Sequence, residues 1–209
     1  MAAKIVVIGT GPGDARYMSP IALEAIGRAE VLVGGQRLLD AFAGPEQIQY
    51  PVERDLPRLI EFIREQRKRR RVAVMVSGDT GIFSLATYLL NHFDREEMEF
   101  IPGISSLQVM FARLKRSWNE AAILSTHGRG PEHLLATIKN YPLTALFTGA
   151  PWTPVEIARY LKENGVPDLQ VALGKDLSYP EEQIIYTSLE LLTHDQAAYN
   201  NTVMVIFNE

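Results

Sequence analysis

Short runs of β-branched residues alternate along this chain with amphipathic helical patterns, and this alternation limits the possible fold more than any other feature. The runs begin at Lys4 (KIVVIG), Glu30 (EVLVGG), Arg71 (RVAVMVSG) and Met98 (MEFIPG). They are apolar without a clean polar alternation, which is typical of strands covered on both faces. The alternation of strand and helix therefore predicts a mostly parallel sheet sandwiched by helices.

The helical patterns between these runs have recognisable starts. Ser19 and Pro20 form an N-cap followed by proline at the first helical position, and apolar residues then recur at i, i+3, i+4 and i+7 from Ala22. The same spacing begins at Leu56, and a third helix is expected over 82–90. Each helix can thus bury one face against the sheet.

The pattern pauses in polar residues at 115–119 (KRSWN), where we place a domain boundary. Residues 1–117 are predicted to form an N-terminal α/β domain with glycine-rich loops. Residues 118–209 are predicted to form a C-terminal α/β domain whose closely spaced strands favour a mixed sheet. A capping box at 153–156 begins a helix there, and Gly165 ends it. Two α/β halves with a cleft between them are the simplest architecture.

The charge balance of the 209-residue chain narrows the function. It has 21 Lys and Arg against 25 Asp and Glu, a net charge of −4, so no global positive field attracts nucleic acid or an anionic membrane. The basic run 67–71 follows an amphipathic helix, and we interpret it as a solvated helix end. Any anionic ligand must therefore be met by local cations.

Other classes of site are disfavoured by residue type. The chain has no cysteine, and its histidines have no metal-ligand spacing, so no bound metal is expected. The N-terminus shows no charged leader, and no apolar run reaches the roughly 18 to 20 residues of a membrane span. We expect a soluble cytoplasmic protein.

The first glycine-rich loop, Gly9–Asp14 (GTGPGD), lies between a strand and a helix, where a dinucleotide-binding loop would lie. Two residues oppose that interpretation. Pro12 removes a backbone N–H that a phosphate would need, and Asp14 places a carboxylate toward the pyrophosphate. The second strand also ends in Gly34-Gly35-Gln36-Arg37 without the acidic residue that would bind a ribose. A pyrophosphate ligand is therefore not expected here.

Two further loops, 77–84 (SGDTGIFS) and 101–106 (IPGISS), also join strand to helix. In a parallel sheet all three loops fall at the carboxyl edge, where ligands of open α/β sheets bind. They offer close backbone approach, hydroxyls and the carboxylates of Asp14 and Asp79. This inventory suits a ligand with an ammonium or sulfonium group and no phosphate.

These three loops, in order and spacing, resemble the motifs of the tetrapyrrole methylases, which transfer a methyl group from S-adenosylmethionine (SAM). Residues 33–39 (VGGQRLL) and 124–129 (LSTHGR) are similar to the branch that methylates carbon 5 of a corrinoid precursor, the precorrin-6Y methyltransferase type. The resemblance covers essentially the whole chain. It implies a SAM pocket lined by Pro12, Gly78, Asp79, Ile82, Ser105, Ser106, Thr148, Ala172 and Thr202.

A corrinoid precursor carries many carboxylates, so the chain must supply cations to bind it. Arg37, His127 and Arg129 are the candidates, and Asp14 is added to the expected substrate site. An arginine can bind a carboxylate bidentately, although Arg37 could equally be an exposed helix-start residue. His127 and Arg129 are also the candidate catalytic residues, and His127 could accept a proton or simply bind an anion.

The resemblance implies a SAM-dependent C-methyltransferase of cobalamin biosynthesis that acts on carbon 5 of a precorrin or cobalt-precorrin. Alternatives are a methylase for another ring carbon, a methylase for a diphthine precursor or an RNA ribose, and a non-catalytic homologue that serves as a binding partner. The family also implies a homodimer. Because the chain has one set of glycine loops, methylation at carbon 15 and loss of CO2 would need a separate partner.

Overall fold

The computed structural model describes residues 3–126 and 130–208 of the chain. The chain divides into two compact units, residues 1–105 and 106–209. Helix α5 (Ser106–Leu114) belongs to the second unit because it packs on that unit's sheet, where Met110 lies against Gly174. The division falls before this helix, whereas the polar pause at 115–119 placed the predicted boundary after it.

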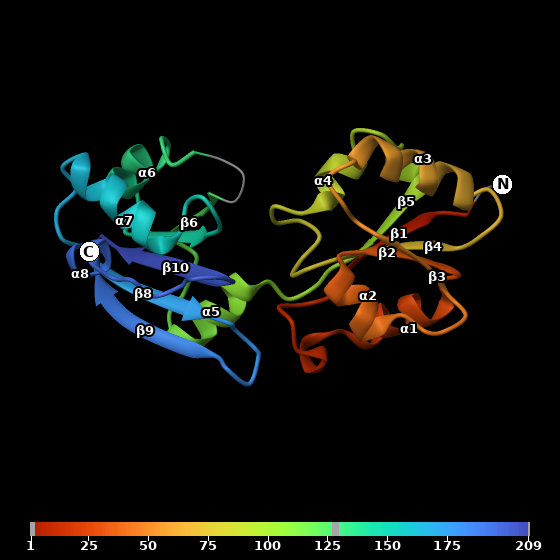
Figure 1. Cartoon of the computed structure of the whole chain (residues 1–209), viewed down its shortest axis with the longest axis horizontal. Coiled ribbons are helices and arrows are strands. Elements are labelled where there is room, and N and C mark those ends of the chain that lie inside the picture. The colour runs from red at the N-terminus through yellow and green to blue at the C-terminus, as the bar shows by residue number, and fades with distance from the viewer. Residues whose placement is uncertain (1–2, 127–129, 209) are drawn as a thin grey trace. The chain divides into compact units, whose positions relative to one another are not determined.

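The first unit is an α/β unit built on one parallel sheet (Figure 1). Its elements are β1 (Ile5–Gly9), the 3-10 helix η1 (Ala15–Tyr17), α1 (Pro20–Arg28), β2 (Val31–Gly34), α2 (Gln36–Phe42), β3 (Ile48–Pro51), α3 (Leu56–Gln66), β4 (Val72–Val76), α4 (Leu85–Leu89), the 3-10 helix η2 (Arg95–Glu97) and β5 (Met98–Ile101). The strand order is β3-β2-β4-β1-β5, and every pairing is parallel. The parallel sheet predicted from the apolar runs is confirmed.

Helices cover both faces of this sheet, because its central strands carry apolar side chains on both faces. One buried cluster joins the strands to α3 and α4, and the other joins them to α1 and α2. Figure 1 shows the two pairs of helices on opposite sides. The predicted start of α1 is also present, because Ser19 Oγ accepts the Ala22 N–H at 3.3 Å.

In this arrangement the chain changes face between the neighbouring strands β1 and β4. The two strands are neighbours, yet the chain leaves β1 toward α1 on one face and leaves β4 toward α4 on the other. Open α/β sheets bind ligands at such a point, outside the carboxyl ends of the strands. The loops after β1 and β4 therefore lie where a ligand is expected.

Three local features differ from the sequence expectation. Helix α4 begins at Leu85, later than expected, because the Ser84 side chain accepts the Ala86 N–H and caps it. Strand β3 had no apolar run because it is an edge strand whose first two residues are exposed. Arg67, expected in a solvated helix end, is 9% exposed and pairs with Glu97 at 2.6 Å.

The second unit is built on a mixed sheet. Its elements are α5, β6 (Ala121–Ser125), α6 (Leu134–Asn140), β7 (Leu143–Phe147), α7 (Pro154–Glu163), β8 (Gln170–Lys175), β9 (Gln183–Ser188), α8 (Leu189–Thr193) and β10 (Thr202–Phe207). The order is β6-β7-β10-β8-β9, with β6 and β7 parallel and the other pairs antiparallel. The predicted mixed sheet is confirmed.

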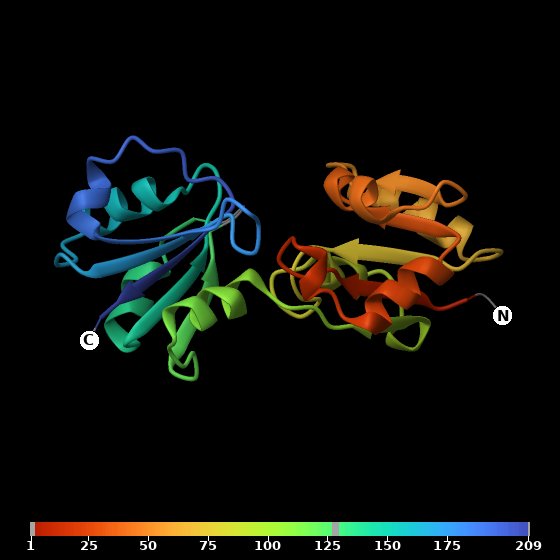
Figure 2. The ribbon, with the colours of Figure 1, turned by 90° about the horizontal axis from the view of Figure 1, so that it is seen from below.

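The main core of the second unit lies on the face covered by α6, α7 and α8. Figure 2 shows the green helix α5 on the other side of the sheet from the cyan helix α7. Only half of the predicted capping box of α7 forms, because Thr153 Oγ1 accepts the Glu156 N–H while the Glu156 carboxylate pairs with Arg159 at 2.7 Å. Among the described residues, no helix combines the length and apolarity that a membrane crossing requires.

Candidate functional site

The loops that follow β1 and β4 are joined through their backbones at the carboxyl edge of the parallel sheet. The Gly78 N–H donates to the Gly11 carbonyl oxygen at 2.8 Å, and the Gly11 N–H donates to the Gly78 carbonyl oxygen at 3.2 Å. Thr10, a buried residue that the sequence analysis did not single out, donates from both N and Oγ1 to the Val76 carbonyl oxygen at 2.9 and 3.0 Å. The first loop is thus fixed to the end of β4.

The third loop meets the other two at a contact that excludes side chains. A Cβ on Gly9 would lie 2.8 Å from the Gly78 carbonyl oxygen, and a Cβ on Gly103 would lie 2.7 Å from the Gly9 carbonyl carbon. Such distances are well inside van der Waals contact, and the opposing atoms are backbone atoms that cannot rotate away. Glycine at both positions is what lets the three loops form one surface, which we call the glycine-built edge (residues 9–14, 77–84 and 102–105).

Asp79 binds two backbone N–H groups of this edge. Its Oδ1 accepts the Gly81 N–H at 2.7 Å and its Oδ2 accepts the Gly103 N–H at 3.0 Å. Asp79 does not cap the following helix, because α4 begins at Leu85 with Ser84 as its cap. Asp79 ties the second loop to the third, and its oxygens keep further lone pairs for a ligand.

The other residues predicted to bind SAM in the first unit lie on the same edge. Pro12 is buried directly after the Gly11 bridge, and Ile82 is half-buried in the second loop. Ser105 is 2% exposed, and its Cα lies 3.7 Å from the position of a Cβ on Gly78. Ser106, which was also predicted to bind SAM, is the first residue of α5 and belongs to the second unit. The structure therefore brings Gly78 and Asp79 of the second loop together with Ser105 of the third.

Asp14, predicted for the substrate site, forms an ion pair within its own turn. Its carboxylate accepts the Arg16 backbone N–H at 2.8 Å and pairs with the Arg16 guanidinium at 2.6 Å. These hydrogen bonds hold the pKa of Asp14 below its usual value. The carboxylate thus caps the short helix η1 and is neutralised by a side chain that is 84% exposed.

Arg37, the substrate candidate of the first unit, is an exposed residue in the first turn of α2. That helix follows β2, whose carboxyl end lies at the same edge of the sheet as the glycine loops because all five strands are parallel. Arg37 therefore follows a strand end at the same edge of the sheet as the glycine loops.

Three SAM candidates lie on the second sheet or directly after one of its strands, and two of them contact each other. Thr148, just after β7, donates from Oγ1 to the carbonyl oxygen of Thr202 at 2.7 Å, and both residues are buried. Ala172 is fully buried in the middle of β8, where it pairs with Val205 of β10. Thr148 and Thr202 thus form one hydrogen-bonded pair at the end of the sheet, and Ala172 lies further along the sheet.

The candidate catalytic residues His127 and Arg129 lie outside the described residues. Strand β6, which precedes them in the chain, ends at Ser125, and Thr126 donates its N–H to the Phe147 carbonyl oxygen at 3.0 Å. Within residues 3–126 and 130–208, no group of three or more histidine and carboxylate side chains is placed to hold a metal ion.

We compared the chain with models of known protein families. The result agrees with the order of the glycine loops and with the two α/β units. The family model described as Tetrapyrrole (Corrin/Porphyrin) Methylases matches residues 4–193. The chain is a tetrapyrrole methylase. The match spans both units and all three glycine loops, so the family resemblance predicted from the motifs is confirmed.

Individual relatives of this tetrapyrrole methylase narrow the comparison. It is 31% identical over 205 residues to the cobalt-precorrin-7 C(5)-methyltransferase of Salmonella typhimurium, covering 98% of this chain and 99% of that one. The crystal structure of the precorrin-6Y methylase of Archaeoglobus fulgidus matches with a TM-score of 0.76 at 24% identity, over 99% and 98% of the two chains. A uroporphyrin-III C-methyl transferase from Thermus thermophilus, complexed with S-adenyl homocysteine, matches with a TM-score of 0.78 at 20% identity, over 98% and 92%. The predicted fold class is confirmed.

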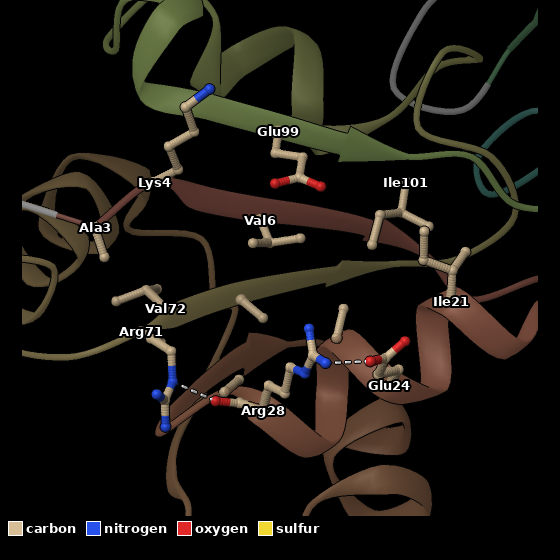
Figure 3. A pocket seen from close by; sticks show the side chains of 13 residues that line it. Ala3, Lys4, Val6, Ile21, Glu24, Arg28, Arg71, Val72, Glu99 and Ile101 are labelled. Carbon is tan, nitrogen blue, oxygen red and sulfur yellow. Dashed lines mark hydrogen bonds and ion pairs between the residues drawn. The ribbon is translucent and has the colours of Figure 1, made fainter.

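This tetrapyrrole methylase also has a cavity of about 380 Å³ near the amino ends of β1 and β4 (Figure 3). Val6 and Ile101 line it together with charged side chains, among which Arg28 pairs with Glu24. None of the described residues predicted to bind SAM or substrate lines this cavity. It is therefore separate from the glycine-built edge.

Proposed function

We propose that this chain is a SAM-dependent C-methyltransferase of cobalamin biosynthesis that methylates carbon 5 of a precorrin or cobalt-precorrin. The observation that carries the proposal is the 31% identity to a cobalt-precorrin-7 C(5)-methyltransferase over nearly the full length of both chains. The similarity of residues 33–39 and 124–129 to the carbon-5 branch of the family supports the same activity.

The described residues of the glycine-built edge fit a SAM ligand. The close approach of Gly9 and Gly103 leaves backbone groups and no side chain at the meeting point of the three loops. Asp79 offers a carboxylate and Ser105 a buried hydroxyl, which suit the ammonium and hydroxyl groups of SAM. Pro12 and Ile82 supply apolar contact. In the second unit, Thr148, Ala172 and Thr202 are proposed to contact the same ligand.

Bound SAM supplies a methyl group on a sulfonium that an electron-rich ring carbon can displace in line. The chain then needs to orient the two reactants and exclude water, and it needs no activated side-chain nucleophile. The absence of cysteine from the sequence agrees with such chemistry. His127 is proposed as the residue that accepts a proton or binds a substrate carboxylate.

The substrate carboxylates require local cations in a chain whose net charge is −4. Arg37 at the start of α2 is proposed to bind one of them, and Arg129 a second, each through the two parallel N–H donors of a guanidinium. Asp14 is proposed to act through Arg16, whose exposed guanidinium it orients at 2.6 Å. In this ion pair the guanidinium is the partner that faces solvent, with 84% of its side chain exposed against 19% for Asp14.

The family resemblance supports a homodimer, and we also propose that the protein is cytoplasmic and transfers a single methyl group. Methylation at carbon 15 and release of CO2 are proposed to belong to a separate chain, because one set of three glycine loops serves one SAM site.

The test is mass spectrometry of the product formed by purified protein, SAM and the corrinoid precursor. We expect a gain of one methylene unit and no loss of CO2. Gly103→Ala should abolish the transfer, whereas Gly27→Ala should not, because a Cβ on Gly27 meets nothing within 4 Å. Two methyl additions, loss of CO2 or no transfer by the wild type would each contradict the proposal.

A further inference from the structure

The loop between β8 and β9, residues 176–182, is held in an unfavourable backbone conformation. Asp176 has φ 47° and Ser178 has φ 76°, and Asn201, which the loop contacts, has φ 47°. Non-glycine residues rarely adopt these left-handed values, and each costs free energy that the surrounding structure must offset. Five such residues occur in the described chain, and three of them gather at this end of the second sheet. Specific contacts must hold them there.

Glu182 supplies the contact that holds the loop. Its Oε2 accepts the Ser178 backbone N–H at 2.7 Å, and its Oε1 accepts a hydrogen bond from Nε of Arg113 on α5. The hydrogen bond from Arg113 holds the pKa of Glu182 below its usual value, so the carboxylate stays charged near neutral pH. Leu177, between the two strained residues, is 2% exposed. The loop is thus fixed to α5 through one carboxylate.

The held loop leads to the pair of threonines at the end of the sheet. The Asp176 N–H donates to the Asn201 carbonyl oxygen at 3.2 Å, and Asn201 Nδ2 donates to Asp176 Oδ1 at 3.1 Å. The next residue is Thr202, whose carbonyl oxygen accepts both Oγ1–H and N–H of Thr148, at 2.7 and 3.3 Å. Hydrogen bonds joined by short stretches of backbone therefore connect Glu182 to Thr148.

We propose that Glu182 is a positioning residue for the cofactor-binding end of the second unit. It fixes the loop 176–182, the loop fixes Asn201, and Asn201 sets the carbonyl oxygen on which Thr148 is anchored. The inference rests on the proposed function, in which Thr148 and Thr202 contact SAM. According to this inference, the Glu182 carboxylate contributes measurably to SAM affinity without contacting SAM itself.

The experiment compares Glu182→Gln with the matched control Glu190→Gln. Glu190 on α8 also forms an ion pair, with Lys162 at 3.2 Å, but α8 follows β9 at the opposite end of the sheet. Calorimetry should show SAM binding weakened roughly five- to twentyfold in Glu182→Gln and unchanged in Glu190→Gln. Hydrogen exchange should show faster exchange of the Thr148 amide, with the Ala145 amide in the middle of β7 unchanged.

The two measurements separate this inference from the proposed function. If the wild type binds no SAM, the proposed function is contradicted, while the Thr148 amide still reports whether Glu182 holds that end of the sheet. Unchanged SAM affinity in a folded Glu182→Gln, unchanged Thr148 exchange, or an equal loss in Glu190→Gln would each overturn the positioning role. If Glu182→Gln does not fold, Arg113→Lys, which keeps the charge but loses the planar fork, should give the same changes to a smaller extent.

Discussion

The two units position their sheet ends by opposite means. In the first unit, three loops meet because Gly9 and Gly103 have no side chain, so the edge consists of backbone groups. In the second unit, side-chain hydrogen bonds hold the end of the sheet. The Thr148 hydroxyl binds the Thr202 carbonyl oxygen, and the Glu182 carboxylate binds the loop 176–182. The first edge depends on space that must stay empty. The second depends on hydrogen bonds that can be lost one at a time.

This difference teaches which substitutions each unit should tolerate. An added methyl group in the first unit meets backbone atoms and must displace a whole loop. A removed hydroxyl in the second unit leaves an acceptor with one hydrogen bond fewer, which costs about 1 kcal/mol. We therefore expect large losses of SAM binding from small changes in the first unit, and graded losses in the second.

The largest expected effect is that of Gly103→Ala. The new Cβ would lie 2.7 Å from the backbone of Gly9, so we expect the free energy of unfolding to fall by about 1 to 3 kcal/mol and SAM binding to be lost. Gly27→Ala in α1 should instead raise stability by about 0.5 to 1 kcal/mol, because alanine favours a helix interior. Urea denaturation and calorimetry of both variants test this, and equal behaviour would refute the steric account.

Asp79→Asn should have the next largest effect. An amide side chain offers one acceptor oxygen, so it cannot accept from both Gly81 and Gly103 as the carboxylate does. We expect SAM affinity to fall roughly tenfold to a hundredfold, equivalent to about 1 to 3 kcal/mol. A variant that folds and binds SAM as well as the wild type would show that the link between the second and third loops is dispensable.

Two threonine substitutions in the second unit test whether a single side-chain hydrogen bond stabilises the end of its sheet. Thr148→Val removes the Oγ1–H that binds the Thr202 carbonyl oxygen, and we expect about 1 kcal/mol of destabilisation with a several-fold loss of SAM affinity. Thr144→Val should be neutral or stabilising, because the buried Thr144 Oγ1 has no hydrogen-bond partner within the described residues. Thermal denaturation of the two variants decides the matter. A loss of stability in both would contradict the hydrogen-bond account.

The smallest expected effect is a pH dependence. Because the folded-state pKa of Glu182 is lowered, its contribution to stability is complete above the unfolded-state pKa of about 4.5 and is lost as pH falls through the lower folded-state value. The difference in free energy of unfolding between wild type and Glu182→Gln should therefore shrink to zero on acidification. Urea titrations at several pH values measure it, and a difference that persists at the acid end would exclude Glu182 as its source.

The sequence predicted the first unit better than the second for a physical reason. Glycine loops after apolar strands locate a parallel carboxyl edge, because strand direction and loop position are both local properties. The partners of Asp79 were not predictable, since Gly103 lies 24 residues away and approaches only in the folded sheet. The contact of Arg113 with Glu182 spans 69 residues and leaves no local pattern. Edge strand β3 was missed because its exposed residues form no apolar run.

Calorimetric titration of the wild-type protein with SAM, and separately with NAD and ATP, tests the central claim most directly. The glycine-built edge has no backbone N–H at Pro12 and places the Asp79 carboxylate where a phosphate would be repelled. The account predicts micromolar SAM binding in the wild type, none in Gly103→Ala, and no response to NAD or ATP. Binding of NAD or ATP without binding of SAM would contradict it.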